Sequence, residues 1–343
     1  MSPSVAIVGA GAAGAAAAYA LRDEPVDVAV FEKRQGVSGR AATRRREGCV
    51  YDCGAGALED GDDAVTTLVT EDLAGEGPVR IEEPVLRVDE DGRLGSVDNG
   101  TTRWTWEAGL DELGERLLDA SGAAVSRETR IDLLDREDSG WRLADAEATD
   151  QGQYDAVLLT PPAPQTADLL GAAAWQHDAC RALREAVAVV PFRTVVTAVL
   201  HYDFALDRPW YALDGRDNDR DLRWVARESC KPGRVPDGEG LLVVQMGHDW
   251  SVEHFEDGGQ PVVEVAASGV ASLLDEERLA TPDWTDRRQW RYALADGRLR
   301  DRASEAAAEH DIFLAGDWVA GDPRLHRALA SGLRAGDRIA RHL

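Results

Sequence analysis

Three glycines near the start of the chain have the spacing of a phosphate-binding turn. Gly9, Gly11 and Gly14 form a GxGxxG pattern between an apolar run, residues 5–8, and an alanine-rich stretch that includes Ala13. In a strand–turn–helix unit the first glycine allows a tight turn, the second lets a pyrophosphate approach the backbone, and the third lets the helix lie close to the strand. The free N–H groups and the dipole at the start of the helix favour phosphate groups. The pattern therefore predicts a dinucleotide site.

An acidic residue follows at the distance expected for a ribose-binding carboxylate. A second predicted strand, residues 26–31, ends in Glu32. An acid about 20 residues beyond such a glycine turn accepts hydrogen bonds from ribose hydroxyls. Glycines alone could serve only the packing of a helix on a strand, but the strand, the turn, the helix and the acid in this order favour the dinucleotide.

The residues after this acid indicate which dinucleotide binds. A simple nicotinamide dehydrogenase normally continues into another strand–helix unit, whereas this chain continues with glycines and arginines over residues 33–46. Such a loop suggests a longer, folded-back cofactor whose pyrophosphate needs additional donors. The alternative is a solvated basic cluster. The candidate cofactor-binding residues of this part of the chain are Lys33, Gly39, Arg40, Asp52, Gly54 and Ala55.

A second candidate cofactor segment lies near the other end of the chain. An apolar strand pattern, residues 312–315, ends in a Gly-Asp pair, and Asp322-Pro323 predicts the start of a helix because proline is favoured at the first helical position. This helix continues with small residues. A terminal helix that only packs against the sheet is the alternative. The candidate cofactor-binding residues of this segment are Gly316, Asp317, Arg324 and Ala328.

Both segments resemble the FAD-binding motifs of the flavin amine oxidase superfamily. In that superfamily the arginine after the glycine, here Arg40, reaches the FAD pyrophosphate, and the aspartate of the Gly-Asp pair, here Asp317, hydrogen-bonds the ribitol chain. The resemblance implies that the C-terminal helix points its start at the flavin, where a helix dipole stabilises the negative charge of the reduced ring. FAD is expected to bind non-covalently, since no cysteine lies after residue 230.

Over nearly the whole chain the match narrows to the bacterial renalase-like flavoproteins. Its specific segments are residues 224–234, which include a Lys-Pro-Gly-Arg sequence, and residues 289–293, which include Trp-Arg-Tyr. The chain departs from this family near its C-terminus, where His326 and Arg327 replace a glutamate and a glycine. These departures bear on the identity of the substrate more than on the binding of FAD.

The resemblance implies an α/β fold. A Rossmann-like FAD-binding domain of the amine oxidase type is expected to be interleaved with an α+β substrate-binding domain built on an antiparallel sheet. We expect the FAD-binding domain to comprise residues 1–58, 112–164 and 296–343. We expect the substrate-binding domain to comprise residues 59–111 and 165–295.

The activity that the resemblance implies is the oxidation of dihydronicotinamide isomers of NAD(P)H. A hydride passes to N5 of the flavin, and O2 reoxidises the flavin with release of H2O2. Alternatives are a flavin amine or amino-acid oxidase or desaturase of the same superfamily, and a non-catalytic FAD-bound scaffold or sensor. No residue is assigned a certain catalytic role, because the cofactor carries the chemistry and the protein orients the substrate and excludes water.

The candidate substrate-binding residues are aromatic and polar side chains on predicted strands. On a regular strand Trp290 and Tyr292 share a face and could stack on a nicotinamide ring, while Arg291 points the other way. Packing of these rings in the core is the alternative. The full set of candidates is Arg193, Gln245, His248, Trp290, Arg291 and Tyr292.

The composition bears on partners and location. The formal net charge is −25, which is expected to repel nucleic acid and anionic membranes. Uniform acidity with only two lysines is typical of salt-loving organisms, and an ordinary acidic cytosolic protein is the alternative. The four cysteines form no CxxC pair and lack the histidine spacing of a zinc site, which predicts free thiols and no metal. With no signal peptide and no membrane-length apolar stretch, we expect a cytoplasmic protein that uses a small-molecule substrate and O2 or another electron acceptor.

Overall fold

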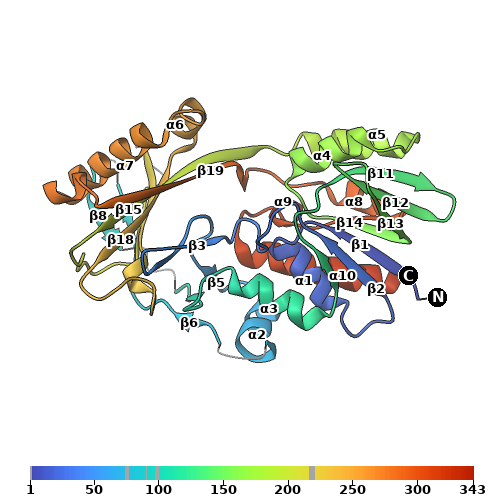
Figure 1. The fold of residues 1–343 in the computed structure, drawn as a ribbon, viewed down its shortest axis with the longest axis horizontal. Helices are drawn as coiled ribbons and strands as arrows, with labels where there is room; N and C mark the ends of the chain where they lie inside the picture. Colours follow the sequence, from blue (N-terminus) through green and yellow to red (C-terminus); the bar gives the residue numbers. More distant parts are fainter. Residues whose placement is uncertain (1, 74–76, 90, 97–99, 216–220) are drawn as a thin grey trace.

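The computed structural model describes residues 2–73, 77–89, 91–96, 100–215 and 221–343. Figure 1 shows two regions, each built on a sheet. The region on the right contains both chain termini, and the region on the left carries the long helix α7 (Gly259–Leu274). The strand β19 (Trp284–Ala295) extends from one region to the other.

A parallel sheet forms the centre of the first region. Its strands are β1 (Ser4–Val8), β2 (Asp27–Phe31), β10 (Ala124–Ser126), β14 (Ala156–Leu159) and β20 (Ile312–Leu314). Over the described residues their order is β10-β2-β1-β14-β20. Since β2 and β14 pair on opposite sides of β1, the carboxyl end of β1 is the topological switch point, where ligands bind in such sheets.

The central strands are mostly apolar because both faces of the sheet are buried. Val5 and Ile7 of β1 belong to one hydrophobic core, while Ala6 and Val8 belong to the core on the opposite face. Alternate residues of a strand point to opposite faces, so a strand covered on both sides needs an unbroken apolar run. The strand–turn–helix unit predicted at the start of the chain is confirmed.

Three helices cover the first face of this sheet: α1 (Ala12–Ala20), α3 (Glu112–Ser121) and α10 (Leu325–His342). Small residues let α1 and α10 approach closely. A Cβ atom on Gly332 would lie 2.1 Å from the carbonyl oxygen of Ala13, and one on Gly336 would lie 2.6 Å from Cβ of Ala20. The small residues of the C-terminal helix therefore have a packing role.

The C-terminal helix starts later than the sequence predicts. A short helix, α9 (Asp317–Ala320), follows β20 and ends at Gly321, whose φ of +87° is in the left-handed region that favours glycine. The chain is extended at Arg324 and α10 begins at Leu325, so the predicted start at Asp322-Pro323 is wrong by two residues. Pro323 lies in the connection between the two helices.

The second face is covered by α4 (Ala163–Ala172), α5 (Asp178–Ala188), α8 (Asp301–Ala308) and an antiparallel sheet of β11 (Ile131–Glu137), β12 (Gly140–Asp145) and β13 (Asp150–Tyr154). The helix α4 follows the prolines that end β14, and Pro164 lies in its first turn, where proline is tolerated. Leu170 and Leu183 share a core with Val157 of β14. We therefore propose that residues 165–190 belong to the FAD-binding domain, and that the domain boundary lies nearer Pro191 than Pro164.

The second region is built on a mixed, mostly antiparallel sheet. Its strands are β7 (Val85–Val88), β8 (Leu94–Ser96), β15 (Phe192–Tyr202), β16 (Ala212–Asp214), β17 (Leu222–Arg227), β18 (Gly240–Met246) and β19. Over the described residues their order is β19-β15-β18-β17-β16-β7-β8, and only the β16–β7 pair is parallel. Val262, Val263 and Ala266 of α7 share a hydrophobic core with β15 and β18. The antiparallel sheet expected for the substrate-binding side is therefore present.

The remaining described elements are shorter. They are the hairpin β3 (Thr43–Arg46) and β4 (Cys49–Asp52), the small sheet of β5 (Leu58–Glu59), β6 (Val79–Arg80) and β9 (Arg103–Thr105), the helices α2 (Asp63–Thr67) and α6 (His248–Glu253), a π-helix (Leu68–Asp72) and two 3-10 helices (Glu228–Cys230 and Glu277–Ala280). Within the described part of the chain, none of the helices is both long enough and apolar enough to span a bilayer.

Candidate functional site

The predicted phosphate-binding turn has the geometry that its glycines require. Gly9 has a φ of +99°, and a Cβ atom on Gly14 would lie 2.0 Å from the carbonyl oxygen of Gly9. In contrast, a Cβ atom on Gly11 would meet only Cα of Gly39, at 3.9 Å, so the turn is open at this point. Gly11 is also the N-cap of α1 and provides no side chain to the free N–H groups of the first helical turn, which includes Ala13. These groups are available to an anion.

Glu32 lies at the end of β2, directly beside this turn. Its carboxylate is buried and accepts hydrogen bonds from the backbone N–H of Ala10 (3.0 Å) and of Arg34 (2.9 Å). Each carboxylate oxygen has a second lone pair, so it can also accept from a ligand hydroxyl. The side chain of the neighbouring candidate Lys33 is directed to Gln165 of α4, to which its Nζ donates a hydrogen bond (3.0 Å).

The two candidate cofactor segments meet at a single ion pair. Arg40 donates to both carboxylate oxygens of Asp317, at 2.6 and 2.9 Å, and also to the carbonyl oxygen of Ala293 in β19 (2.8 Å). Gly39 and Gly316, which precede these two residues, both have positive φ values, +58° and +147°. The N-terminal and C-terminal segments therefore lie together at the carboxyl edge of the parallel sheet.

The segment that contains Gly54 and Ala55 runs close to Arg40. The N–H of Ala55 donates to the carbonyl oxygen of Arg40 (2.9 Å), and a Cβ atom on Gly54 would lie 2.0 Å from that same oxygen. The substrate-side sheet contacts this segment directly: Trp290 Nε1 donates to the Cys53 carbonyl (2.8 Å) and Gln245 Nε2 donates to the Gly54 carbonyl (2.8 Å). Only glycine fits at position 54.

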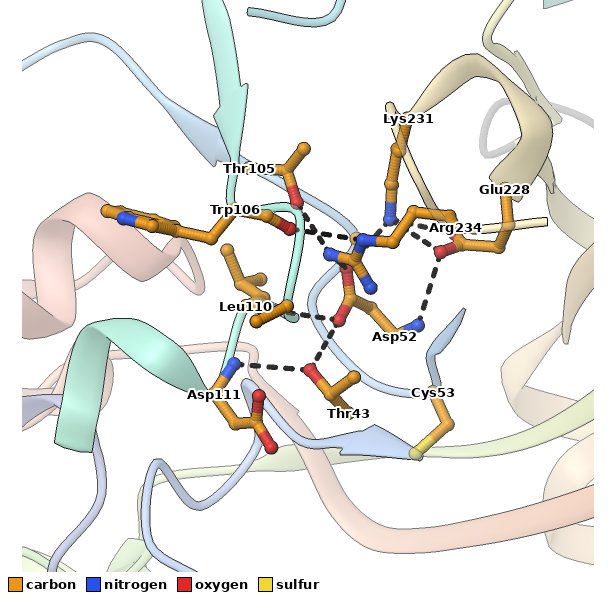
Figure 2. A network of polar contacts seen from close by, with 12 residues as sticks. Thr43, Asp52, Cys53, Thr105, Trp106, Leu110, Asp111, Glu228, Lys231 and Arg234 are labelled. Carbon is orange, nitrogen blue, oxygen red and sulfur yellow. Dashed lines mark hydrogen bonds and ion pairs between the residues drawn. The ribbon is translucent and has the colours of Figure 1, made fainter. Parts of the chain in front are cut away.

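Asp52 belongs to a buried ionic cluster, which we define as Asp52, Glu228, Lys231 and Arg234. Figure 2 shows the two basic side chains converging on the Asp52 carboxylate. Lys231 Nζ lies 2.8 Å from Asp52 and 2.7 Å from Glu228, and Arg234 Nη2 lies 3.1 Å from Asp52. All four side chains are inaccessible to solvent or nearly so. The cluster joins β4 to the loop between β17 and β18.

The acceptor positions of Asp52 are occupied by the protein. Besides the two basic side chains, Asp52 accepts from the hydroxyl of Thr43 (2.6 Å) and from the N–H of Leu110 (3.1 Å). A carboxylate has about four lone-pair sites, so none is left for a cofactor. Asp52 was predicted to bind the cofactor directly, and these contacts indicate instead that it positions the backbone leading to Gly54.

Burial and neighbouring charges shift the pKa values of the residues in this cluster in different directions. Burial opposes the charged form of Asp52, but Lys231 and Arg234 outweigh burial and lower the pKa of this carboxyl. Burial raises the pKa of Glu228, and Lys231 only partly offsets the rise. The two carboxylates raise the pKa of Lys231 despite its burial, so the ammonium stays charged.

The remaining cofactor candidates lie at the start of α10. Arg324 pairs with Glu59 of β5 (2.9 Å), and the N–H of Ala328 donates to the carbonyl of Arg324 (3.1 Å). His326 is buried beside Gly61, where a Cβ atom on the glycine would lie 3.0 Å from the imidazole. Burial lowers the pKa of His326, and the nearby Arg327 lowers it further.

The substrate candidates fall into two groups. Trp290 and Gln245 contact the segment that contains Gly54, through the carbonyl oxygens of Cys53 and Gly54. Tyr292 packs edge-on against Phe192, at a centroid distance of 6.0 Å, and the Arg40 guanidinium lies 5.9 Å from the Phe192 ring. The strand is irregular here, since Val195 pairs with Trp290 whereas Arg193 pairs with Leu294.

The other three candidates have partners away from this segment. Arg291 is exposed and pairs with Glu256 (2.9 Å), Arg193 pairs with Asp296 (2.8 Å), and His248 accepts from the backbone N–H of Thr194 (3.0 Å). The prediction that Arg291 and Trp290 point in opposite directions agrees with these contacts. Arg193 and His248 have structural partners that make them weaker candidates.

Two groups of charged residues were not assigned a role from the sequence. Glu228, Lys231 and Arg234 were noted only as part of a family-specific segment. The chain has only two lysines, so the presence of Lys231 in this segment was a signal that could have pointed to the cluster. Arg288 has no role assigned from the sequence, yet its guanidinium lies 4.8 Å from the centre of the Trp290 ring.

The geometry at the carboxyl edge fits FAD. An open glycine turn at an uncapped helix start, a buried acid beside it and an arginine on the other side provide the groups that a pyrophosphate and a ribose require. A profile of the NAD(P)-binding Rossmann-like domain matches residues 7–71, and a profile of the flavin containing amine oxidoreductases matches residues 82–340. The chain belongs to the flavin containing amine oxidoreductase family. It is therefore an FAD-dependent oxidoreductase, as the two cofactor segments predict, and not a non-catalytic scaffold.

Solved structures with the same fold act on different substrates. A provisionally named protoporphyrinogen oxidase from Exiguobacterium sp. 255-15 is 17% identical, with a TM-score of 0.82 and full coverage of both chains. Cyclohexylamine oxidase from Brevibacterium oxydans IH-35A is 14% identical, with a TM-score of 0.76 and 99% of each chain covered. Reduced UDP-galactopyranose mutase is 10% identical, with a TM-score of 0.77 and 100% of this chain and 95% of that chain covered. At these identities the fold is shared and the substrate is open.

Proposed function

We propose that the protein is a renalase-like oxidase that takes a hydride from an isomeric dihydronicotinamide dinucleotide. FAD, bound non-covalently, would accept the hydride and pass the electrons to O2, releasing H2O2. Gly9, Gly11, Gly14, Glu32 and Arg40 would hold its pyrophosphate and ribose. Asp317 would bind its ribitol chain.

The observation that carries this proposal is an excess of positive charge around Trp290. Arg288 stacks on the indole, and the guanidinium carbon of Arg34 lies 6.0 Å from the same ring. Burial lowers the pKa of Arg288, and the charges of Arg34 and Arg44 lower it further, while Cys53 and Asp286 only partly oppose them. Arg288 Nε is buried and has no hydrogen-bond partner among the described residues.

Arg44 pairs with Asp286 (2.6 Å), so the positive charge around Trp290 is only partly compensated, and the remainder favours an anionic ligand. A dihydronicotinamide dinucleotide carries a pyrophosphate, which guanidinium groups bind well. An amine substrate is a cation at neutral pH and would be repelled by the same groups. The surrounding chain has a net charge of −25, so a local cluster of arginines is a specific feature and not a property of the whole surface.

The chain's own residues would then orient the substrate. Arg288 would bind phosphate oxygens, and the Trp290 ring, fixed by its hydrogen bond to Cys53, would provide an apolar surface for the nicotinamide. Gln245 bridges Gly54 and Arg223, since its Nε2 donates to the former and its Oε1 accepts from the latter at 3.2 Å, so it would keep the sheet in place over the cofactor segment. Position and exclusion of water are the protein's contributions.

An amine oxidase is the second candidate, because the family and the fold of cyclohexylamine oxidase both allow it. Anaerobic mixing of the purified protein with 2- and 6-dihydronicotinamide dinucleotides, ordinary NADH and a panel of amines separates the two. We expect rapid bleaching of the flavin band by the isomers and slow bleaching by NADH. Bleaching only by amines would reassign the protein as an amine oxidase.

The charge argument has its own test. Loss of charge-assisted hydrogen bonds worth about 1.5–3 kcal/mol should raise KM about 10- to 150-fold in Arg288→Met. The increase should be absent for a dihydronicotinamide riboside, which carries no phosphate, and absent in the control Arg291→Met, whose side chain lies on the exposed side of the strand. An equal effect on both substrates would contradict the assignment of Arg288 to phosphate binding.

A further inference from the structure

Three side chains that could bind a metal ion lie together where the β3–β4 hairpin meets the antiparallel sheet. Cys49 is the first residue of β4, His201 lies near the end of β15, and Glu239 directly precedes β18. One sulfur, nitrogen or oxygen atom from each of them lies within 4.8 Å of the others. We propose that these residues form a zinc site that is separate from the flavin chemistry.

The kinds of ligand atom favour zinc over other common ions. A thiolate, an imidazole and a carboxylate are ligands that Zn2+ accepts together, whereas Mg2+ and Ca2+ require oxygen ligands. Bonds of about 2.0–2.3 Å in a tetrahedral site place ligand atoms about 3.5 Å apart. The three atoms therefore need to move by about an ångström or less each to reach this geometry.

The surroundings of His201 partly match those of a metal-binding histidine, with a carboxylate near Nδ1 that would have to move closer to accept a hydrogen bond. Nε2 lies 2.8 Å from Glu239, while Nδ1 is buried, has no hydrogen-bond partner among the described residues and lies 4.0 Å from the Asp283 carboxylate. Metal-binding histidines usually donate their second nitrogen to a carboxylate, which fixes the ring. The ring is also stacked on Trp284, at a centroid distance of 4.8 Å and an angle of 7°.

Burial differs among the three ligands in a way that gives the ion access. Cys49 and the His201 side chain are buried, the latter with 8% exposed, whereas the Glu239 side chain is 34% exposed. An ion can therefore enter from the Glu239 side, where water would complete the tetrahedron. A cysteine binds Zn2+ as the thiolate, so binding at Cys49 would release the thiol proton.

Binding would form bonds from Zn2+ to the three side chains, break the S–H bond of Cys49 and release one proton to solvent. No electron is transferred. The ion would connect β4 to the antiparallel sheet only three residues before Asp52 of the buried ionic cluster. Such a connection would tie the substrate side to the hairpin that leads to the flavin segment.

The test is a titration of the chelator-treated, flavin-loaded protein with ZnCl2, followed by calorimetry in buffers of different ionisation enthalpy. We expect one Zn2+ per chain and release of a proton. Cys49→Ser should weaken binding at least about 100-fold, and Asp283→Asn should weaken it about 10- to 100-fold, as expected for a carboxylate that orients a ligand. The control Cys180→Ser removes another buried thiol and should leave binding unchanged.

A Cd2+ titration keeps the test decisive if a variant folds poorly. Binding of Cd2+ to a thiolate gives a ligand-to-metal charge-transfer band in the absorption spectrum of the wild-type protein. His201→Gln should weaken Cd2+ binding without removing the thiol. Absence of stoichiometric binding by the wild-type protein, or binding by Cys49→Ser equal to that of the wild type, would overturn the proposal. Neither result depends on the substrate of the enzyme.

Discussion

The buried ionic cluster gives the sharpest prediction about stability. In Lys231→Met an apolar side chain of similar length replaces the ammonium that lies 2.8 Å from Asp52 and 2.7 Å from Glu228. Both carboxylates are fully buried or nearly so and would lose their shared cation. Removal of one partner from a buried ion pair typically costs about 3–5 kcal/mol, because it leaves a charge unpaired in a medium of low dielectric constant.

The expected change in melting temperature follows from the size of the chain. An unfolding entropy of about 2.1 cal/mol/K per residue over 343 residues converts 3–5 kcal/mol into a decrease of about 4–7 °C. Thermal unfolding followed by circular dichroism at constant salt measures this decrease. The matched control is Lys33→Met, which removes the only other lysine, an exposed one, and should change the melting temperature by less than about 1 °C.

The loss should also depend on pH. Burial already raises the pKa of Glu228, and the ammonium partly opposes the rise, so its removal raises this pKa further. The folded variant then holds a proton that the unfolded chain releases above its pKa of 4.5, and stability falls as the pH rises through this window. We therefore expect Lys231→Met to be more destabilised at pH 8 than at pH 5.

A second substitution tests the cause directly. Glu228→Gln in the Lys231→Met background removes the unpaired negative charge and keeps the side-chain volume, so most of the lost stability at pH 8 should return. If the double variant is no more stable than Lys231→Met, or if the single variant melts like the wild type, unpaired buried charge is not what the lysine prevents.

Three further predictions concern the cofactor site. Gly54→Ala would place a Cβ atom 2.0 Å from the carbonyl oxygen of Arg40, so it should lower the amount of flavin bound per chain, measured as an absorbance ratio. The control Gly36→Ala, whose Cβ atom would meet no atom within 4 Å, should leave the flavin content unchanged. Equal flavin content in both variants would contradict this close contact. Arg40→Met removes the proposed pyrophosphate donor, and at about 1.5–3 kcal/mol for charged hydrogen bonds the flavin dissociation constant should rise about 10- to 150-fold in a fluorescence titration; an unchanged constant would show that the phosphates lie elsewhere. Burial lowers the pKa of His326 in the folded protein, whereas the pKa of a histidine in the unfolded chain is about 6.5. As the pH falls, the unfolded chain therefore binds the proton first. The melting temperature of the wild type should decrease between pH 7 and pH 5 more steeply than that of His326→Gln. Parallel curves for the two proteins would mean that His326 titrates normally.

Local sequence was enough to predict the elements that the cofactor needs. The turn at Gly9 requires a positive φ, and the close approach at Gly14 leaves no room for a side chain. The need for glycine at both positions can therefore be predicted without knowledge of the rest of the fold. The unbroken apolar run of β1 likewise reflects burial on both faces. Helix starts were less readable, because Pro323 is compatible with a connection as well as with a first turn.

The partners of side chains were decided by the tertiary structure. Arg40 and Asp317 were both predicted to bind FAD, but only the parallel sheet brings them within 2.6 Å across 277 residues of chain. Asp52 was predicted to bind the cofactor as part of the segment that resembles an FAD-binding N-terminus, and the loop after β17 instead supplies the cations that occupy it. A residue's neighbours in sequence determine its backbone conformation, whereas the charges around it come from whichever strands lie alongside.

The placement of Cys49 shows most clearly what the tertiary structure adds to the sequence. Spacing along the chain indicated no metal site, since Cys49, His201 and Glu239 come from separate strands. Pairing of β15 with β18 places His201 opposite Leu241, two residues from Glu239, and the hairpin adds the thiol. Local backbone geometry and apolar periodicity determined the strand–turn–helix unit and the two flavin segments, and the family resemblance of those segments implied the α/β fold. The ionic cluster, the arginines around Trp290 and the proposed metal ligands depend on strand register, which only the assembled sheets fix.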